Sequence, residues 1–355
     1  MKLEDLGYNN NFETLRVKQK LDDFEIGRIR SEHKERYIVM TQKGDFEAEI
    51  TGNMQYTAKS REDFPAVGDW VALATYGSNL GIIHKVLPRF SVIKRQAVGH
   101  VGEVQIIATN IDYAFLIQSV DRDFNINRLE RYLTICNSSH VTPIIVLTKT
   151  DLVDEKHISE IKNNPRLSIK KVLVLALSNE TKYGYETLIS TIKKGKTYCM
   201  LGSSGVGKST LLNNLSGRNI METGSISQSS NRGKHVSSHR ELIVLKNGGI
   251  LIDTPGMREI GITDAVAGIE TTFDEIMSLS EKCKFRDCTH TTEIGCSVLK
   301  ALEEGRLEIK SYENYLKLQR EQTHFESAVA KKRKADKAFG KMIKIHKKMK
   351  NRNKY

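Results

Sequence analysis

The stretch that decides the fold is "LGSSGVGKSTLLNNL", residues 201–215. It contains Gly202, Gly207, Lys208 and Ser209 in the spacing G-x-x-x-x-G-K-S, which is typical of a phosphate-binding loop. The apolar segment "TYCML" precedes the loop, and the segment "STLLNNL" after it has the character of a helix. About 200 residues stand before this loop, although such loops usually follow the first strand of their domain.

The chemistry expected of this loop is electrostatic. Its glycines allow backbone N–H groups to turn toward phosphate oxygens, and the N-terminus of the following helix adds positive potential. Lys208 is expected to reach the β- and γ-phosphates, and the hydroxyl of Ser209 to bind Mg²⁺. The nucleotide-binding residues predicted here are Gly202, Ser203, Ser204, Gly205, Val206, Gly207, Lys208, Ser209 and Thr210.

A second candidate for phosphate chemistry lies about 45 residues further on, in "GGILIDTPGM". Asp253 stands at the C-terminal end of an apolar strand, where a carboxylate can contact Mg²⁺ through water. The N–H group of Gly256 is expected to contact the γ-phosphate.

Base recognition is predicted upstream of the loop. "VLTKTDL" places Thr148, Lys149, Thr150 and Asp151 directly after an apolar strand, and it resembles the guanine-recognition motif of GTPases, Asn/Thr-Lys-x-Asp. The carboxylate of Asp151 can accept hydrogen bonds from the guanine N1–H and exocyclic amine together, a pair of donors that adenine lacks. The stem of Lys149 can pack over the base. Thr148 stands where Asn is usual, which alters one side-chain contact.

A second base-contacting loop follows the next strand, in "LVLALSNE". Ala176, Leu177 and Ser178 occupy the place where GTPases carry that loop. Base recognition therefore comes before phosphate binding along the chain, which is the reverse of the usual order. This order indicates a circularly permuted GTPase, in which the strands that normally close the domain come first.

The chain divides into segments of different pattern. Residues 24–96 show short alternating strands with turn signals, including a hairpin from "RYIVMT" to "FEAEIT". They predict an antiparallel barrel of about five strands, of which the oligonucleotide-binding barrel is the commonest kind. An SH3-like or other small barrel without a nucleic-acid role fits the same pattern. From about residue 104, apolar runs alternate with helical spacing and predict a doubly wound α/β domain.

A cysteine-rich segment follows the α/β pattern. "CKFRDCTHTTEIGC" carries Cys283, Cys288, His290 and Cys296. Three thiolates and one imidazole make a closed tetrahedral shell for one structural Zn²⁺ per chain. A redox pair is the alternative, and the lack of a Cys-x-x-Cys spacing argues against it.

The basic residues gather at the C-terminus. Of the formal charge of +12, residues 331–355 contribute +11, from twelve Lys or Arg and one Asp. Apolar side chains recur there at helical intervals, which predicts a helix with a thin apolar stripe and a wide basic face. The stripe comprises Ala335, Ala338, Phe339, Met342, Ile345 or His346, and Met349. Such a helix could lie on a membrane surface or on RNA, and the weak stripe favours RNA; a solvated tail is the alternative.

Barrel, permuted GTPase and Cys/His cluster together resemble the ribosome small-subunit-dependent GTPase A family, bacterial factors that act late in small-subunit maturation. The resemblance covers nearly the whole chain and includes "FPAVGDWV" (64–71), "FNINRLERYL" (124–133) and "NRGKHVSSHREL" (231–242). It implies an oligonucleotide-binding barrel at 1–98, a permuted GTPase domain at 99–278, and a helical zinc-binding domain with a basic tail at 279–355.

The stretch 231–242 corresponds to switch I in this family. The family usually has His-Thr-Thr there, whereas this chain has His235-Val236-Ser237. The resemblance implies that Ser237, or Ser238 as second choice, ligates Mg²⁺. It also implies that His235 orients the attacking water; the alternative is that His235 is an exposed polar residue on a mobile loop. Met257 stands where Ras-like enzymes have the Gln that orients the attacking water. A Met side chain cannot orient water, so slow basal hydrolysis is expected.

The function predicted from the sequence is hydrolysis of GTP to GDP and phosphate by a small-subunit assembly factor. The expected cofactors are Mg²⁺ with GTP, and Zn²⁺. The expected partners are the small (30S) ribosomal subunit, which would stimulate hydrolysis, and its rRNA. A cytoplasmic protein without a membrane partner is expected, because no run of eighteen apolar residues and no secretory signal is present. The protein is also expected to be a monomer. Two alternatives remain: a regulatory GTPase unrelated to ribosomes, and a zinc-containing RNA-binding protein in which nucleotide toggles affinity.

Overall fold

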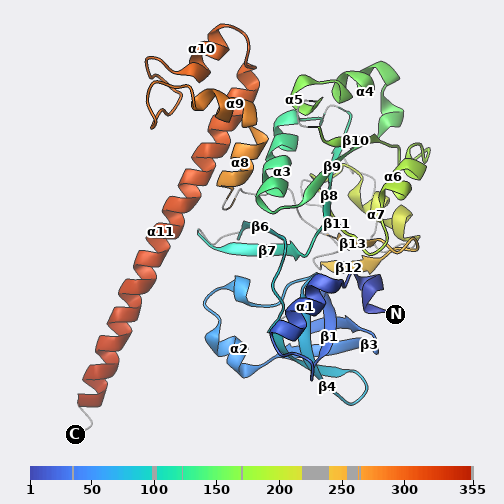
Figure 1. Ribbon diagram of the computed structural model, residues 1–355, viewed down its shortest axis with the longest axis vertical. Helices are drawn as coiled ribbons and strands as arrows, with labels where there is room; N and C mark the ends of the chain where they lie inside the picture. The colour runs from blue at the N-terminus through green and yellow to red at the C-terminus, as the bar shows by residue number, and fades with distance from the viewer. Residues whose placement is uncertain are drawn as a thin grey trace, which may run out of the picture.

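The computed structural model describes residues 1–33, 36–97, 102–121, 123–168, 171–217, 240–253, 263 and 265–352. A barrel lies at one end of the molecule and an α/β sheet with its helices lies above it, while a long C-terminal helix runs along one side (Figure 1). Within the described residues, no helix combines the length and apolar character needed to cross a membrane.

The N-terminal barrel is closed by five strands. They are β1 (Glu25–His33), β2 (Arg36–Thr41), β3 (Gly44–Ile50), β4 (Trp70–Tyr76) and β5 (Leu80–Val86). The strands pair in the order β1-β2-β3-β5-β4, and β4 pairs back onto β1. Alternate residues point inward and form a buried core that includes Ile29, Val39, Phe46, Val71 and Ile83. The predicted five-stranded barrel and the hairpin of β2 with β3 are confirmed.

A short N-terminal segment packs between the barrel and the α/β sheet (Figure 1). The helix α1 (Asn10–Lys18) packs Phe12 against Trp70, whose indole is fully buried. Arg28 is buried below this contact, and its guanidinium donates to the carbonyl oxygens of Leu6, Gly68 and Asn110 at 2.6, 3.1 and 3.0 Å. Burial lowers the pKa of Arg28 to about 10. One side chain thus ties together the N-terminus, the barrel and the first turn of the α/β region.

The α/β sheet has six strands in the order β10-β9-β8-β11-β13-β12. They are β8 (Tyr113–Ser119), β9 (Thr142–Thr148), β10 (Leu173–Ala176), β11 (Thr197–Leu201), β12 (Glu241–Val244) and β13 (Ile250–Asp253). All are parallel except the edge strand β12, which is antiparallel to β13. At that edge Glu241 pairs with Ser31 of β1, so the sheet continues into the barrel.

Helices cover both faces of this sheet, which confirms the doubly wound fold. On β8, Ala114 and Leu116 belong to the core under α3 (Ile126–Ser138). Phe115 and Ile117 belong to the core under α6 (Tyr185–Thr191) and α7 (Lys208–Ser216). The two helices α4 (Glu155–Lys162) and α5 (Pro165–Ser168) connect β9 to β10.

Two strands between barrel and α/β sheet form a separate hairpin. The alternating pattern of the barrel continues in sequence to residue 96, but β6 (Val92–Gln96) pairs with β7 (Val104–Thr109) rather than with the barrel. Alternation is the same for any half-buried antiparallel strand, so it does not specify which sheet a strand joins.

The C-terminal region is helical, as predicted. It comprises α8 (Val266–Thr272), α9 (Asp274–Ser280), α10 (Ser297–Glu303) and α11 (Ile309–Arg352), and these helices share a core around Ile269, Phe273, Val298 and Leu318. Two helices of this core, α8 and α9, lie before the cysteine-rich segment at which the helical region was expected to begin. The basic tail is the continuation of α11 and projects away from the body (Figure 1).

The C-terminal helices are fastened to α3. Arg131 pairs with Glu321 of α11 through two hydrogen bonds of 2.6 and 2.7 Å. The buried Glu130 is paired with Arg166 and also accepts a hydrogen bond of 2.7 Å from Asn314 of α11. Beside these contacts α8 approaches α3 at Gly268, where an added Cβ would lie 2.1 Å from the carbonyl oxygen of Thr134.

Gly268→Ala should therefore force α8 away from α3. We expect a loss of about 1–3 kcal/mol in unfolding free energy, the usual cost of overpacking, measured by urea denaturation. Gly340→Ala is the matched control, because an added methyl group there meets open space on α11 and should be neutral or slightly stabilising. Equal stability of the two variants would contradict the close approach of the two helices.

Candidate nucleotide site and metal centre

The phosphate loop lies between β11 and α7. Gly207 caps α7 with φ +90°, and an added Cβ there would lie 2.5 Å from Nδ2 of Asn179. At Gly202 an added Cβ would lie 2.6 Å from the carbonyl oxygen of Ile117. Both glycines of the motif are thus required by close approach of neighbouring chain segments. Ser204 and Gly205 are exposed at the tip of the loop.

Lys208 lies across the mouth of this loop. Its ammonium group donates to the carbonyl oxygens of Gly202 and Ser203 at 2.8 and 2.5 Å. Ser209 and Thr210 follow in the first turn of α7 and are half-buried. The arrangement leaves a cation at the centre of a loop whose tip is open to solvent.

The two predicted base-recognition segments lie together. Thr150, Asp151 and Leu152 form a 3₁₀ turn after β9, and the exposed carboxylate of Asp151 accepts a hydrogen bond of 2.5 Å from the hydroxyl of Ser178. The backbone of Thr150 donates to the carbonyl oxygen of Leu177 at 3.4 Å, next to Ala176 at the end of β10. The hydroxyl of Ser178 is a hydrogen-bond donor that fixes the orientation of the Asp151 carboxylate.

Lys149 has a left-handed backbone, with φ +59°. Its ammonium group pairs with Asp121, at the end of β8, at 2.9 Å. Burial raises the pKa of Asp121, but the hydrogen bonds from Lys149, Ser119 and the backbone of Asp123 outweigh burial and lower that pKa below its usual value. The stem of Lys149 is thereby held in one direction beside Asp151.

Hydrogen bonds join the base-recognition segments to the phosphate loop. The buried hydroxyl of Thr148 donates to the carbonyl oxygen of Val206 at 2.7 Å. The amide of Asn179 donates to the carbonyl oxygen of Gly207 at 3.1 Å, and Tyr185 fixes that amide by a hydrogen bond of 2.6 Å to its oxygen. Three segments that are far apart in sequence thus form one surface.

Sequence reasoning missed Asn179 and Asp121 as members of this site. Asn179 directly follows the predicted loop 176–178, and Asp121 follows the apolar run of β8. Both stand at the carboxyl ends of parallel strands, where ligand-binding residues of such sheets gather, and this position is the signal that could have found them.

Asp253 ends β13 and is buried, with 8% of its surface exposed. It therefore stands at the same edge of the sheet as the phosphate loop. The other predicted residues of the Mg²⁺ and hydrolysis site, His235, Ser237, Ser238, Gly256 and Met257, lie outside the residues that the structure describes.

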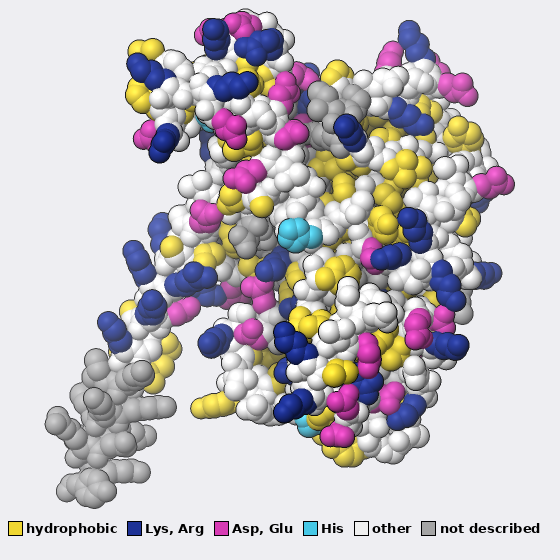
Figure 2. Space-filling view, viewed as in Figure 1, with side chains coloured by type: hydrophobic (Ala, Val, Ile, Leu, Met, Phe, Trp, Pro, Cys, Tyr) yellow, Lys and Arg dark blue, Asp and Glu magenta, His cyan; other side chains and the backbone are white. Residues whose placement is uncertain are grey.

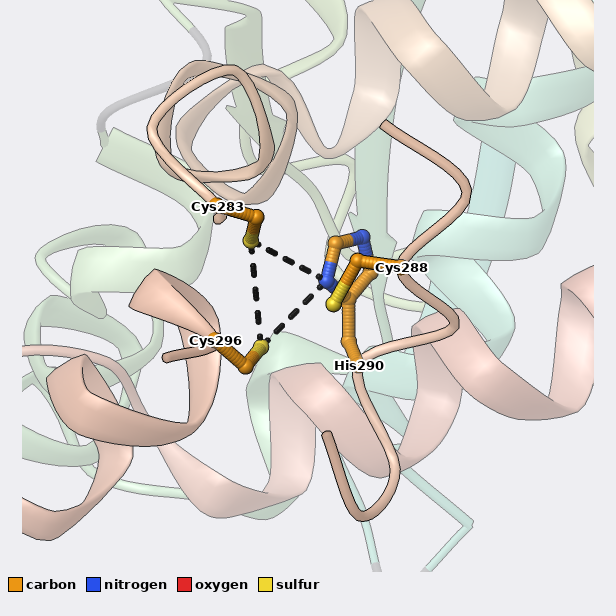
Figure 3. Close-up of side chains that lie close together, drawn as sticks. All are labelled: Cys283, Cys288, His290 and Cys296. Carbon is orange, nitrogen blue, oxygen red and sulfur yellow. Dashed lines mark hydrogen bonds between the residues drawn. The ribbon is translucent and has the colours of Figure 1, made fainter. Parts of the chain in front are cut away.

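The four predicted zinc ligands converge (Figure 3). One ligand atom from each of Cys283, Cys288, His290 and Cys296 lies within 4.8 Å of the others. Sγ of Cys283 and Sγ of Cys296 are 3.8 Å apart, and they lie 3.6 and 3.5 Å from Nδ1 of His290. A Zn²⁺ tetrahedron with bonds of about 2.3 Å to sulfur and 2.0–2.1 Å to nitrogen has edges of about 3.8 and 3.6 Å. The donor set therefore fits zinc.

The surroundings of the cluster favour thiolates and a cation. Backbone N–H groups of Ser297 and Leu299 donate to Sγ of Cys283 and Cys296 at 3.3 and 3.4 Å. Burial opposes ionisation of Cys283, but backbone hydrogen bonds lower its pKa below the usual value. Burial and the neighbouring thiols raise the pKa of Cys288 to about 12. Crowded thiolates of this kind are stable together when a metal cation neutralises them.

Comparison with known proteins identifies the family to which this chain belongs. A family model described as RsgA GTPase matches residues 86–263. A model described as ABC transporter matches residues 185–353, a smaller part of the chain that includes the phosphate loop common to many nucleotide-binding proteins.

Relatives and solved structures cover more of the chain. "Small ribosomal subunit biogenesis GTPase RsgA 1" of Listeria innocua is 41% identical over 91% of this chain and 90% of its own length. The protein of that name from Bacteroides thetaiotaomicron is 38% identical over 97% and 96%. The crystal structure of YloQ, a circularly permuted GTPase, aligns with a TM-score of 0.59 at 26% identity over 84% of this chain and 94% of YloQ. YjeQ from Thermotoga maritima shares the fold, with a TM-score of 0.62 at 24% identity over 83% of this chain and 96% of YjeQ. The chain therefore belongs to the RsgA GTPase family and has the circularly permuted GTPase fold.

Proposed function

We propose that the protein binds GTP at the surface formed by Asp151, Ser178 and the phosphate loop, and hydrolyses it to GDP and phosphate during assembly of the small ribosomal subunit. The observation that carries this proposal is the set of hydrogen bonds from Thr148 and Asn179 to the phosphate loop. They support the proposal because they join the segments that carry Asp151 and Ser178 to the phosphate loop at one edge of the sheet. The names of the relatives supply the ribosomal role.

Each part of the site has a role in this proposal. Asp151 accepts the two guanine donors while Ser178 holds its carboxylate, and Lys208 with the backbone N–H groups of the loop binds the phosphates. Ser209, Ser237 and Asp253 would hold Mg²⁺, which neutralises charge on the β- and γ-phosphate oxygens when it is bound. We infer from the family resemblance that Gly256 contacts the γ-phosphate and that His235 orients the attacking water.

We propose further that the chain works as a monomer in the cytoplasm, divided at about residues 98 and 278. Its rRNA contact would include the end of α11. Phe339 and Met342 are 60% and 61% exposed there, among lysines and arginines on a helix that stands clear of the body (Figure 2). Basic side chains on a projecting helix suit contact with phosphates of RNA.

The first prediction from the proposed function concerns the base. Asp151→Asn should weaken GTP binding about 100-fold, because two charge-assisted hydrogen bonds worth about 1.5 kcal/mol each are lost. The same variant should favour xanthosine triphosphate, whose base carries a carbonyl where guanine has its amine. Binding is measured by titration with fluorescent nucleotides.

Asp154→Asn is the matched control for this prediction. Asp154 caps α4 through the backbone N–H of His157, close to Asp151 in sequence, and its loss should leave nucleotide choice unchanged. Equal affinity of the unmodified protein for ATP and GTP would refute the proposed base recognition.

The second prediction concerns the metal. The purified protein should hold about one zinc per chain, and Cys296→Ser should release it and loosen the core of α8 to α11, while GTP binding survives. Zinc is measured by mass spectrometry of metal content. Cys136→Ala, which removes a buried thiol from α3, should keep the zinc. Metal-free protein that is insensitive to chelators would show that the cluster is not a zinc site.

The third prediction concerns the tail. Removal of residues 335–355 deletes eight of the twelve basic residues of the tail but keeps the pair of Lys332 with Glu103. Binding to small subunits should weaken, its salt dependence should become shallower, and subunit-stimulated hydrolysis should fall. Basal hydrolysis should stay the same, because no proposed nucleotide contact lies in the tail.

Co-sedimentation with small subunits, large subunits and membrane vesicles, each with a GTP analogue and with GDP, measures the partner. The double variant Phe339→Ala, Met342→Ala removes two side chains of the apolar stripe but keeps the basic residues. It therefore shows whether the stripe or the charge contributes to binding. Preference for large subunits or vesicles, or hydrolysis by the intact protein that small subunits do not stimulate, would contradict the proposed role.

A further inference from the structure

Arg128 contacts the phosphate loop from outside it. It lies in the first turn of α3, where Asn125 caps the helix by accepting a hydrogen bond from the backbone of Arg128. Its guanidinium Nη1 donates to the hydroxyl of Ser203 at 3.0 Å. Helix α3 begins after β8, so this contact joins two neighbouring strand ends across the loop.

The charge of Arg128 has no carboxylate partner in the described part of the chain. Its bond to Ser203 is the polar contact that its guanidinium makes there, and the side chain is half-buried. Two other arginines of this region, Arg131 and Arg166, are paired with Glu321 and Glu130. A guanidinium has five N–H donors, and the bond to Ser203 uses one of them. The other donors can bind an anion beside the loop.

A second cation meets Arg128 at Ser203. The ammonium group of Lys208 donates to the carbonyl oxygen of Ser203 at 2.5 Å, while Arg128 donates to its hydroxyl. In loops of this kind the lysine binds the β- and γ-phosphates. The side of the loop at which both cations gather is therefore the side toward the terminal phosphate, and two like charges held so close favour an anion between them.

We propose that Arg128 binds the γ-phosphate of GTP and makes the site distinguish GTP from GDP. This inference rests on the proposed GTP binding and deepens it. Ser203 holds the guanidinium in place, and Arg128 would then donate to an oxygen of the γ-phosphate. The charge that develops on these oxygens during hydrolysis is stabilised by the same contact, from an arginine that belongs to the chain itself.

Arg128→Gln tests the proposal, because it removes the charge and keeps a side chain that can bond Ser203. Affinities for a non-hydrolysable GTP analogue and for GDP are measured in Mg²⁺ by fluorescence titration of the full-length protein. We expect about a 10- to 100-fold loss for the GTP analogue, the range for a hydrogen bond between charged groups. The loss for GDP should be under about 3-fold, and kcat should fall. Arg128→Lys, which restores a point charge, should recover part of both effects.

Arg131→Gln is the matched control. It changes the same charge one turn further along α3, but its partner is Glu321 of α11, so the ratio of GTP to GDP affinity should not change. Melting temperatures without nucleotide show whether each variant is folded.

Equal losses for GTP and GDP in Arg128→Gln would overturn the inference, because they would mean that Arg128 only supports the loop. An unchanged GTP affinity would overturn it as well. Failure of the unmodified protein to bind GTP would overturn the proposed function and this inference together, so the two failures are distinguishable.

Discussion

The hydrogen bond from the hydroxyl of Thr148 to the carbonyl oxygen of Val206 joins the two halves of the proposed nucleotide site. It joins the end of β9 to a loop that comes 58 residues later in the chain. The parallel strands β9, β8 and β11 are neighbours, so their carboxyl ends meet at one edge whatever the order in which the chain visits them. Because the site depends on this edge and not on chain order, base recognition can precede phosphate binding without loss of geometry.

A second constraint fixes the C-terminal helices on the GTPase domain. The carboxylate of Glu130 is fully buried, and taking a charge out of water is costly unless every oxygen is paired. Arg166 of the GTPase domain donates to both oxygens, and Asn314 of α11 adds a further hydrogen bond to one of them. Removal of α11 from this place would cost the buried carboxylate one of its donors, which favours the observed position of the C-terminal helices.

The fold followed from the sequence where its signals were local. The apolar runs of β8 and β9 and the glycines of the phosphate loop each carry their own pattern, and so does the Cys/His cluster, whose four ligands lie within one short segment. What could not be predicted depends on tertiary pairing. Nothing in the residues of β6 indicates that it pairs with β7 outside the barrel, and α8 is too short for its period to show that it packs on α3.

The same limit applies to the site. In the sequence, Thr148 is a departure from the Asn that is usual in the guanine-recognition motif. In the structure its hydroxyl donates a hydrogen bond to the phosphate loop, because β9 and β11 belong to one sheet. Arg128 appears in sequence as one of several charges on an amphipathic helix. Its contact with Ser203 depends on the pairing of β8 with β11, which no periodicity encodes.

Helix α11 gives the molecule a lever arm. Its last contact with the body in the described residues is the pair of Lys332 with Glu103, and the helix continues to Arg352 (Figure 1). Twenty residues of helix span about 30 Å, so a tilt of about 10° at the pivot moves the tip by about 5 Å. Nearer to its start α11 also contacts α3, whose first turn contacts the phosphate loop through Arg128 and whose next turn holds Glu321 through Arg131. A small tilt of α11 about the pair of Lys332 with Glu103 would therefore shift the end of the helix by more than the diameter of a water molecule.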